Sequence, residues 1–363
     1  MKHQLGDRDK ALLADMKRFN EQIGRTGWKV SNVTMEDMDL SGIELDNAQI
    51  KDAEWTNITI NNGTIRNSVF DGVHFEKGSF SNTTFDNCRF TDCSFGYVKM
   101  SENTITRCTF ESCTMDHAKI EKGTLQNTLF RKLKDTRSSF RDIGCATVTF
   151  DGSSLHYTTF SGATIDTARF TDCTLADAVF EKITGSAMTF EGSRLNLTVF
   201  RHGSSKQISF ERCESANGFT FASVDIAGMS LASCKDLSFF TINEGRVSGL
   251  AIRKCEGMTK SAFFGVTVEG LDVKECTLDY VDIEKSTLRG TNAIASSRVT
   301  GLNFTGSTIA GLTIKDTRLV EYVAVSGASF SHLVLSGVSY VSPFRKIEKE
   351  PVTYAESDVF GDR

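Results

Sequence analysis

The sequence predicts an all-β solenoid in which the chain winds into four-sided coils that stack along one axis. Three observations carry this prediction. A large apolar residue recurs at every fifth position from Val30 onward, residues 20 apart are often identical, and the 363-residue chain contains only two prolines, Pro343 and Pro351. Neither the helical period of 3.6 nor the strand period of 2 produces a strict period of five. We therefore expect one long, continuously hydrogen-bonded repeat rather than domains joined by linkers.

Each five-residue unit has two inward positions: a large apolar central residue and a small residue two places before it. If each unit forms one side of a coil, four units complete the coil, and equivalent positions four units apart lie on successive coils. One such column contains only phenylalanine: Phe70, Phe90, Phe110, Phe130, Phe150, Phe170, Phe190 and Phe210. Aromatic rings pack favourably when they stack along a column. The 20-residue period therefore predicts stacked coils.

The phase of the repeat slips by single residues after Ser215. Each slip is a six-residue unit, which we interpret as a one-residue bulge at a corner of the coil. The predicted solenoid domain then spans residues 28–342. At about 4.8 Å per coil, its 15 to 16 coils would extend roughly 75 Å.

The repeated units resemble the pentapeptide-repeat family, whose consensus is small–Asp/Asn–Leu/Phe–x–x. The sequence contains CRFTD, CSFGY, ARFTD, AVFEK and SSFRD in this register. The resemblance implies a right-handed quadrilateral β-helix over residues 28–342. It does not specify one function, because members of the family include topoisomerase inhibitors and secreted effectors.

The two ends of the chain differ from the repeat. Residues 1–27 are expected to form a helical cap, because Leu12, Met16, Phe19 and Ile23 lie on one helical face within residues 7–24. Such a helix would cover the apolar core and the strand edge of the first coil. Residues 343–363 are expected to form a polar tail, in which Phe344 and Ile347 fold back over the last coil.

The cysteines and histidines do not form a pattern typical of a reactive site. Nine of the ten cysteines occupy the small inward position, and Cys145 occupies a central one. We interpret them as buried, reduced thiols, typical of a cytoplasmic protein, with export without a cleavable signal peptide left open. The six histidines are scattered, and we find no metal-ligand spacing, nucleophile motif or phosphate-binding loop. The sequence therefore predicts no catalytic residue, no metal and no cofactor, and it predicts that the protein is not an enzyme.

The charge pattern limits the class of partner. The net charge of −5 argues against direct binding of nucleic acid, and no apolar stretch is long enough to span a membrane. A basic patch nevertheless surrounds Asp135, which takes a central inward position. The patch comprises Arg131, Lys132, Lys134, Arg137 and Arg141. It is either a corner that docks an acidic partner or a nucleic acid, or a bulge whose charges are merely solvated, which is the interpretation we favour.

The first coils are acidic. Residues 31–95 contain 11 acidic and 4 basic residues, a net charge of −7. Over about three coils, this is one net charge per roughly 2 Å, close to the value for duplex DNA. The candidate partner-binding residues at this acidic end are Asp37, Asp39, Glu44, Asp46, Asp52 and Glu54. Residues 1–30 carry a net charge of +3, so the alternative is that the N-terminal segment neutralises this end.

The sequence therefore favours a non-enzymatic scaffold for protein–protein interaction, and the resemblance implies a bacterial secreted effector or secretion-associated protein. The alternative is a DNA-mimicking modulator of DNA gyrase of the quinolone-resistance type. A third hypothesis is a homodimer formed through the final coil. The residues that such a dimer would bury are Leu333, Leu335, Val338 and Tyr340.

Overall fold

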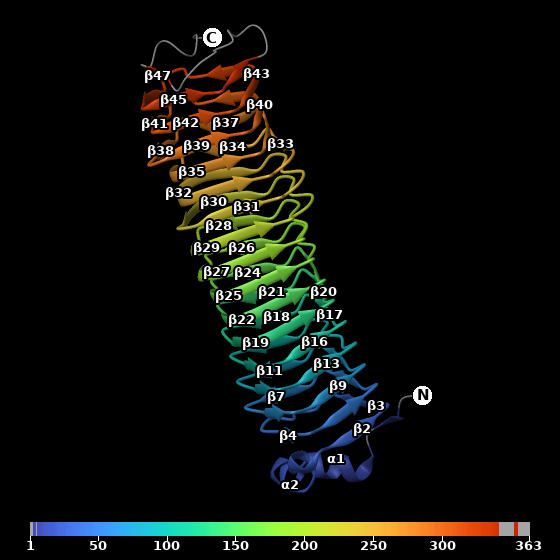
Figure 1. Cartoon of the computed structure of the whole chain (residues 1–363). Helices are drawn as coiled ribbons and strands as arrows, with labels where there is room; N and C mark the ends of the chain where they lie inside the picture. Colours follow the sequence, from blue (N-terminus) through green and yellow to red (C-terminus); the bar gives the residue numbers. More distant parts are fainter. Residues whose placement is uncertain (1–2, 5, 341–351, 355–363) are drawn as a thin grey trace. The chain divides into compact units, whose positions relative to one another are not determined.

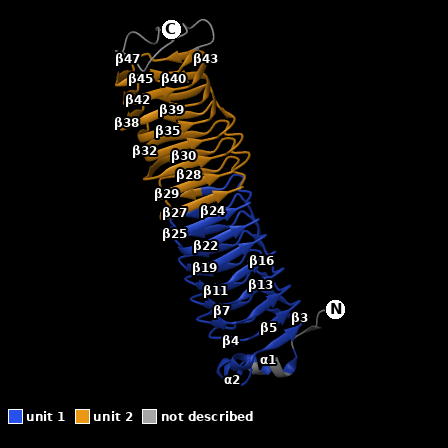
Figure 2. Cartoon of the chain, in the orientation of Figure 1, with its two compact units in different colours: residues 1–179 blue, residues 180–363 orange. Residues whose placement is uncertain are grey.

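The structure is a computed structural model that describes residues 3–4, 6–340 and 352–354. It divides into two compact units, residues 1–179 (unit 1) and residues 180–363 (unit 2) (Figure 2). In each unit, short strands pair in parallel with strands one coil further along the chain, as Phe70 does with Phe90 and Phe200 with Phe221 (Figure 1). One strand in each five-residue unit, paired with the strand four units later, gives four sides per coil. Both units are therefore parallel β-solenoids, as the sequence predicts.

The predicted N-terminal helix is present as two short helices, α1 (Asp7–Leu13) and α2 (Met16–Gln22), followed by the 3-10 turn η1 (Gly24–Thr26). The helix is interrupted because Asp15 begins a new one: its carboxylate accepts a hydrogen bond from the Arg18 amide at 3.2 Å. Phe19 is completely buried and packs edge-on against Trp28, 5.2 Å away. The side chain of Leu12 lies outside the described residues.

The four sides of unit 1 are named here by their strands. Side 1 contains β3 (Val33–Glu36), β6 (Glu54–Thr56), β10 (His74–Glu76), β17 (Thr114–Asp116), β20 (Lys134–Thr136) and β23 (Ser154–His156), and β1 (His3–Gln4) pairs with β3. Side 2 contains β7 (Thr59–Asn61), β11 (Ser79–Ser81), β14 (Lys99–Ser101), β18 (Lys119–Glu121), β21 (Ser139–Arg141) and β24 (Thr159–Ser161). Side 3 contains β4 (Glu44–Asp46), β8 (Thr64–Arg66), β12 (Thr84–Asp86) and β15 (Thr104–Thr106). Side 4 contains β2 (Lys29–Ser31), β5 (Gln49–Lys51), β9 (Val69–Asp71), β13 (Arg89–Thr91) and β16 (Thr109–Glu111). Three longer strands continue from side 3 onto side 4: β19 (Thr124–Arg131), β22 (Gly144–Asp151) and β25 (Thr164–Thr171).

Unit 2 repeats this arrangement with several strands that continue around a corner. Its first strands are β26 (Val179–Glu181), β27 (Thr184–Glu191), β28 (Val199–Arg201), β29 (Ser204–Glu211), β30 (Thr220–Ile226), β31 (Met229–Ala232) and β32 (Thr241–Arg253). These are followed by β33 (Met258–Thr259), β34 (Ala262–Phe264), β35 (Thr267–Lys274), β36 (Thr277–Asp279), β37 (Val281–Glu284), β38 (Thr287–Arg289) and β39 (Asn292–Ala295). The last strands are β40 (Arg298–Asn303), β41 (Thr308–Ala310), β42 (Leu312–Lys315), β43 (Arg318–Ala324), β44 (Ser329–Ser331), β45 (Leu333–Ser336), β46 (Ser339–Tyr340) and β47 (Val352–Tyr354). Phe200 pairs with Phe221, so this coil is one residue longer than the coils of unit 1, in which Phe70 pairs with Phe90.

The phenylalanine column fills the core behind side 4. Phe110, Phe130 and Phe150 are stacked, with ring centroids 4.9 Å and 4.7 Å apart and nearly parallel planes. Each of these residues is at most 2% exposed. The strand spacing of about 4.8 Å is also a favourable stacking distance for aromatic rings, so identical residues at 20-residue intervals satisfy both requirements.

The corners explain why asparagine, aspartate and glycine are frequent in the repeat. The second residue after each central position usually has a positive φ, for example 54° at Asn57, 50° at Asn67 and 56° at Asn62. This left-handed conformation is unfavourable for most side chains, and asparagine, aspartate and glycine tolerate it best. The chain therefore turns at every corner without a loop.

The last described strand closes one edge of unit 2. β47 pairs antiparallel with β45, placing Val352 opposite Leu335 and Tyr354 opposite Leu333. An exposed strand edge can pair with another chain, so β47 protects the edge of β45 in the final coil. Phe344 and Ile347, which were expected to fold over this coil, lie outside the described residues.

Candidate functional site

The cysteines are structural in the described residues. All ten are buried free thiols, and most occupy a position where the thiol reaches two backbone carbonyl groups. Cys88 Sγ, for example, lies 3.3 Å from the Ile65 oxygen and 3.4 Å from the Asp86 oxygen. Burial raises the pKa of both Cys145 and Cys173 to about 12. These two thiols hold little of the reactive thiolate, and burial keeps all ten away from solvent.

Asp135 is a buried carboxyl group in the core of unit 1. It lies on β20 between Met115 and Leu155, and its exposed fraction is 1%. Thr158 Oγ1 donates a hydrogen bond to Asp135 Oδ2 at 2.8 Å, while Oδ1 has no partner among the described residues. Burial raises the pKa of Asp135 to about 6, although hydrogen bonds from Ser138 and Thr158 act in the opposite direction. The central position therefore carries a group that is costly to ionise.

The acidic end does not form one surface. The strand assignments place Glu54 on side 1, and Glu44 and Asp46 on side 3. Asp39 pairs with Thr59 on side 2, and Asp37 and Asp52 lie at corners, both with positive φ. The six candidate residues therefore surround the first coils.

Most of these acidic residues also have a partner within unit 1. Arg25 Nε lies 2.5 Å from Glu44 Oε2, and this hydrogen bond lowers the pKa of Glu44 below its ordinary value. Asp39 accepts two hydrogen bonds from Ser41. Similarly, Asp37 accepts one from Asn57 at 2.7 Å, and Asp46 one from Asn67 at 2.9 Å. The N-terminal segment therefore neutralises one acidic residue of this end, and amide groups from the next coil bind two more.

Charged residues on sides 3 and 4 form ion pairs between successive coils. The pairs are Lys51–Asp71 at 3.5 Å, Arg89–Glu111 at 2.6 Å, Arg107–Asp86 at 2.6 Å and Arg131–Asp151 at 3.2 Å. The hydrogen bond from Arg89 lowers the pKa of Glu111. Exposed pairs of this kind contribute little to stability, but they leave these two sides with little unbalanced charge.

The basic patch separates into paired and unpaired residues. Arg131 pairs with Asp151 on side 4, and Arg141 pairs with Asp142 at 3.4 Å beside side 2. Lys132 and Lys134 are exposed, and the described residues place no carboxylate within 4.0 Å of either ammonium group. Arg137 lies at the corner between sides 1 and 2, with its guanidinium carbon 5.7 Å from the centre of the Tyr157 ring. The five residues are thus distributed around the coil rather than on one extruded loop.

That same corner carries residues that the sequence analysis did not identify. Tyr97 and His117 are stacked, with ring centroids 5.0 Å apart and planes within 7° of parallel. Tyr97 and Tyr157 are 55% and 52% exposed. We call Tyr97, His117, Arg137 and Tyr157 the Tyr97 corner. Its signal in the sequence is a tyrosine at the fifth-residue position where asparagine, aspartate or glycine is expected.

The candidate dimer residues are buried within unit 2. Leu333, Leu335 and Val338 have exposed fractions of 3–4%. The backbone of β45, which contains two of these leucines, pairs with β47. The side chain of Tyr340 lies outside the described residues.

Unit 2 has an open hollow on the outside of the successive strands β27, β29, β30 and β32. Its volume is about 440 Å³, and its lining includes His202, Ser223, Glu244 and Arg246. Ser223 Oγ donates to Glu244 Oε2 at 2.9 Å, and Arg246 binds Glu269 at 2.5 Å. In the described ranges, no group of three or more histidine, cysteine, aspartate or glutamate residues could hold a metal ion. No helix described here is long and apolar enough to cross a membrane.

The solved structures that are similar to this chain include the following three. One is HetL, a pentapeptide repeat protein involved in heterocyst differentiation regulation from the cyanobacterium Nostoc sp. strain PCC 7120, with 12% identity, coverage of 62% of this chain and 92% of HetL, and a TM-score of 0.37. Another is full-length QnrB1, a plasmid-mediated fluoroquinolone resistance protein, with 14% identity, coverage of 56% of this chain and 93% of QnrB1, and a TM-score of 0.30. The third is a mannuronic acid specific polysaccharide family 6 lyase from human gut microbiota, with 9% identity, coverage of 88% of this chain and 82% of the lyase, and a TM-score of 0.33. No curated protein matches the sequence.

The family is indicated by a segment of unit 1. Residues 83–160 match the family model described as a pentapeptide repeat region. The same five-residue register of buried residues continues on both sides of this segment, from Leu40 to Phe80 and from Phe170 to Phe210. Residues 83–160 of this chain are therefore similar to the pentapeptide-repeat family, and the same register of buried residues extends beyond the matched segment.

Proposed function

We propose that this protein is a non-enzymatic scaffold that binds a protein partner with the outer surface of its coils. The proposal is based on the different residues found at the inward and outward positions of the repeat. Inward positions hold the apolar residues, all ten cysteines and the buried carboxyl group of Asp135. Outward positions recur in fixed columns, one residue per coil. Such a surface is rigid and repetitive, which suits recognition of an extended partner.

The experiment is capture of partners by the immobilised full chain, followed by titration with each purified partner. One variant per side replaces two exposed residues of that side, and thermal unfolding verifies that each variant keeps its fold. We expect a stoichiometric partner whose binding is lost with the variant of one side and kept with the other three. Failure to find a stoichiometric partner, or consumption of the bound molecule in a chemical reaction, would refute the scaffold.

A bacterial secreted effector, or a secretion-associated protein, is the finer version of this proposal. It is supported by the resemblance of the repeat to families that include effectors. The test is to follow the epitope-tagged chain in cells and culture medium of the organism that produces it. Accumulation in the medium without cell lysis supports export, and retention of the whole pool in the cytoplasm opposes it.

DNA mimicry directed at DNA gyrase is the second candidate. The net charge of residues 31–95 supports it, and the distribution of the six candidate acidic residues over three sides and two corners of the coil weighs against it. The test is gyrase supercoiling of relaxed plasmid, with and without a quinolone. Inhibition or drug protection that disappears when Asp37, Asp39, Asp46 and Asp52 become asparagine supports mimicry. An unchanged supercoiling rate at micromolar protein removes it.

A further inference from the structure

The Tyr97 corner is unusual in its composition. Only two of the protein's six tyrosines lie in unit 1, Tyr97 and Tyr157, and both lie at this corner. At the equivalent corner of unit 2, the exposed apolar residues are Leu197, Phe239 and Tyr280. The other corners of the described coils carry no tyrosine, phenylalanine or leucine with a positive φ. Large apolar side chains are therefore placed at one corner of the repeat and at no other described corner.

Folding alone does not account for this choice. Tyr97, His117, Arg137 and Tyr157 have φ values of 56°, 55°, 61° and 57°. These values lie in the left-handed region, where a side chain destabilises the backbone relative to glycine or asparagine. Asn57, at the same corner two coils before Tyr97, shows that asparagine fits there. Polar and charged residues such as Arg107 and Lys122 also have a positive φ at other corners, so the backbone conformation alone does not distinguish this corner. What distinguishes it is the exposed tyrosine rings, which the fold does not bury and which point to contact with another molecule.

The orientation of the rings indicates which molecule fits. Tyr97 stacks on His117, and Arg137 lies over the ring of Tyr157, so these ring faces contact each other. The corner therefore presents ring edges, hydroxyl groups and a guanidinium group, with one face of each of these rings covered, and the His117 ring is held by Asp116 at 2.9 Å. Single-stranded nucleic acids require free faces on which bases stack. Tyrosine and arginine side chains that present edges and donors are instead typical of the energetic centres of protein interfaces.

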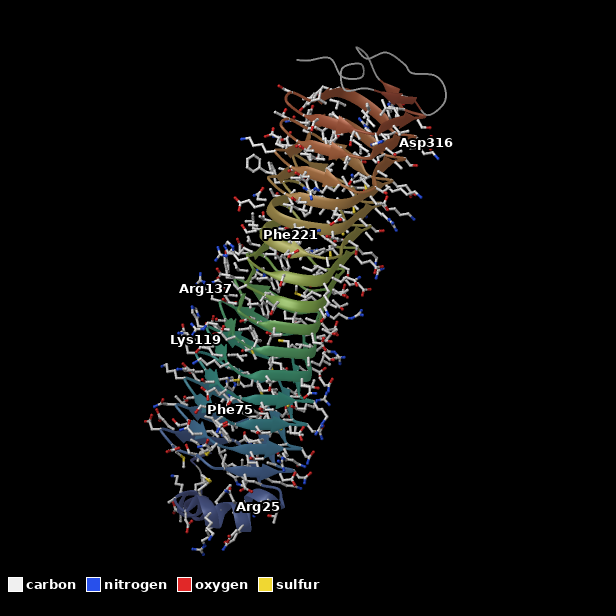
Figure 3. The ribbon with its side chains drawn as sticks, turned by 90° about the vertical axis from the view of Figure 1, so that its left-hand side faces the viewer. Arg25, Phe75, Lys119, Arg137, Phe221 and Asp316 are labelled. Atoms are coloured by element: carbon white, nitrogen blue, oxygen red, sulfur yellow. The ribbon has the colours of Figure 1, made fainter. Side chains whose placement is uncertain are left out.

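Apart from Asp116, which bonds to His117, the described charged residues beside the corner that have no partner are basic, and they favour an acidic partner. Lys99 and Lys119 begin successive strands of side 2 and lie in register with each other. Both are exposed, as are Lys134 on side 1 and Arg137 at the corner. Among the described residues, no carboxylate lies within 4.0 Å of these four cations, whereas the arginines of sides 3 and 4 named above are paired. Figure 3 shows Lys119 and Arg137 on the same edge of unit 1, both directed away from the ribbon.

We propose that the Tyr97 corner, with Lys99, Lys119 and Lys134 beside it, is the docking site for an acidic segment of a partner protein. The proposal rests on the proposed scaffold function and specifies its surface. Three coil steps separate Tyr97 from Tyr157, or about 14 Å, so an extended segment of about five residues would span the corner. The carboxylates of that segment would accept hydrogen bonds from the lysines, from Arg137 and from the tyrosine hydroxyl groups.

The experiment uses the full chain and a fluorescent 15-residue peptide of alternating glutamate and tyrosine, followed by fluorescence anisotropy. The double variant Tyr97→Asn/Tyr157→Asn keeps the charge and introduces a residue that the corner tolerates, so its melting temperature should not fall. We expect its affinity for the peptide to fall at least fivefold. Arg137→Asn should weaken binding similarly. The matched control Arg107→Asn also removes an arginine with a positive φ, at a corner next to side 3, and should change the affinity less than twofold.

Two outcomes would overturn the proposal. Equal affinity of the tyrosine variant and the unaltered chain would mean that the lysines attract any polyanion. Tighter binding of a 15-nucleotide oligothymidylate, lost in the same variants, would identify single-stranded nucleic acid as the ligand class. The same variants are then used in the capture experiment. If a partner binds every variant of the Tyr97 corner but not the variant of another side, this site is refuted and the scaffold function is retained. If no partner binds at all, the scaffold function itself is refuted.

Discussion

Thr158 donates a hydrogen bond to the buried carboxyl group of Asp135 from the next coil, at 2.8 Å. One oxygen of Asp135 is thereby satisfied, and the other has no partner among the described residues. This arrangement suits a neutral carboxylic acid better than a carboxylate. The raised pKa of about 6 makes the stability of unit 1 dependent on pH.

We predict that Asp135 destabilises the protein at neutral pH. Its pKa is raised from 3.8 in the unfolded chain to about 6 in the folded one. Stability is therefore highest below about pH 4, falls as the pH rises through 6, and changes little above it through this group. At 1.36 kcal/mol per pKa unit, Asp135→Asn should raise the free energy of unfolding at pH 8 by roughly 2–3 kcal/mol.

Chemical denaturation at pH 4 and at pH 8 measures this effect. Asp172→Asn, at an exposed corner of the same unit, is the matched control for removal of one carboxylate. A gain from Asp135→Asn that is the same at pH 4 and pH 8 would contradict the titration.

The N-terminal helices should depend on Asn20 for their attachment to the first coil. Its side chain donates to the Gly42 oxygen and accepts from the Glu44 amide, both at 2.8 Å, and it is 6% exposed. Asn20→Ala leaves these edge groups unsatisfied and should destabilise the protein by about 1–3 kcal/mol. The uncovered strand edge should also promote self-association, which sedimentation velocity measures.

Arg25→Ala is the comparison for Asn20→Ala. Arg25 bonds to Glu44 on the exposed surface, and such pairs are worth little. We expect this variant to lower stability much less than Asn20→Ala does and to remain monomeric. Equal losses in the two variants would show that the ion pair, rather than the buried amide, attaches the helices.

We predict that Leu197 destabilises the folded protein relative to an asparagine at the same corner of unit 2. It has a φ of 53° and is 56% exposed, so it strains the backbone and buries little apolar surface. Leu197→Asn should raise the free energy of unfolding by about 1 kcal/mol. The neighbouring Leu195 is 1% exposed, and Leu195→Asn should instead abolish the stable fold of its coil. A loss of stability in Leu197→Asn would show that this leucine has a structural role.

The ten cysteines should not react with Ellman's reagent in the folded protein. All are buried, so the reagent cannot reach them, and in Cys145 and Cys173 burial also raises the pKa to about 12. We expect no fast-reacting thiol before unfolding and ten after addition of guanidinium. Thr104→Cys, at an exposed strand position of side 3, should add one fast thiol. Rapid reaction of any native cysteine would show local opening of the core.

The sequence alone was sufficient to predict the solenoid, the four-sided coil and the phenylalanine column. These follow from a local pattern: a period of five specifies the sides, and a period of 20 specifies the stacking. The inward position of the cysteines follows from the same register. Neither inference requires knowledge of which distant residues meet.

Tertiary structure decided what happens on the outside and at the ends. Outward residues are alike in the repeat, so only the stacking of coils showed that Arg131 binds Asp151 while Arg137 lies over Tyr157. The neutralisation of Glu44 by Arg25 and the antiparallel pairing of β47 involve chain ends, where no repeat sets the register. Periodicity fixes which residues face inward, because burial is repeated in every coil. The partner of a surface side chain depends on which residues lie beside it in the folded structure, and these neighbours differ from one coil to the next.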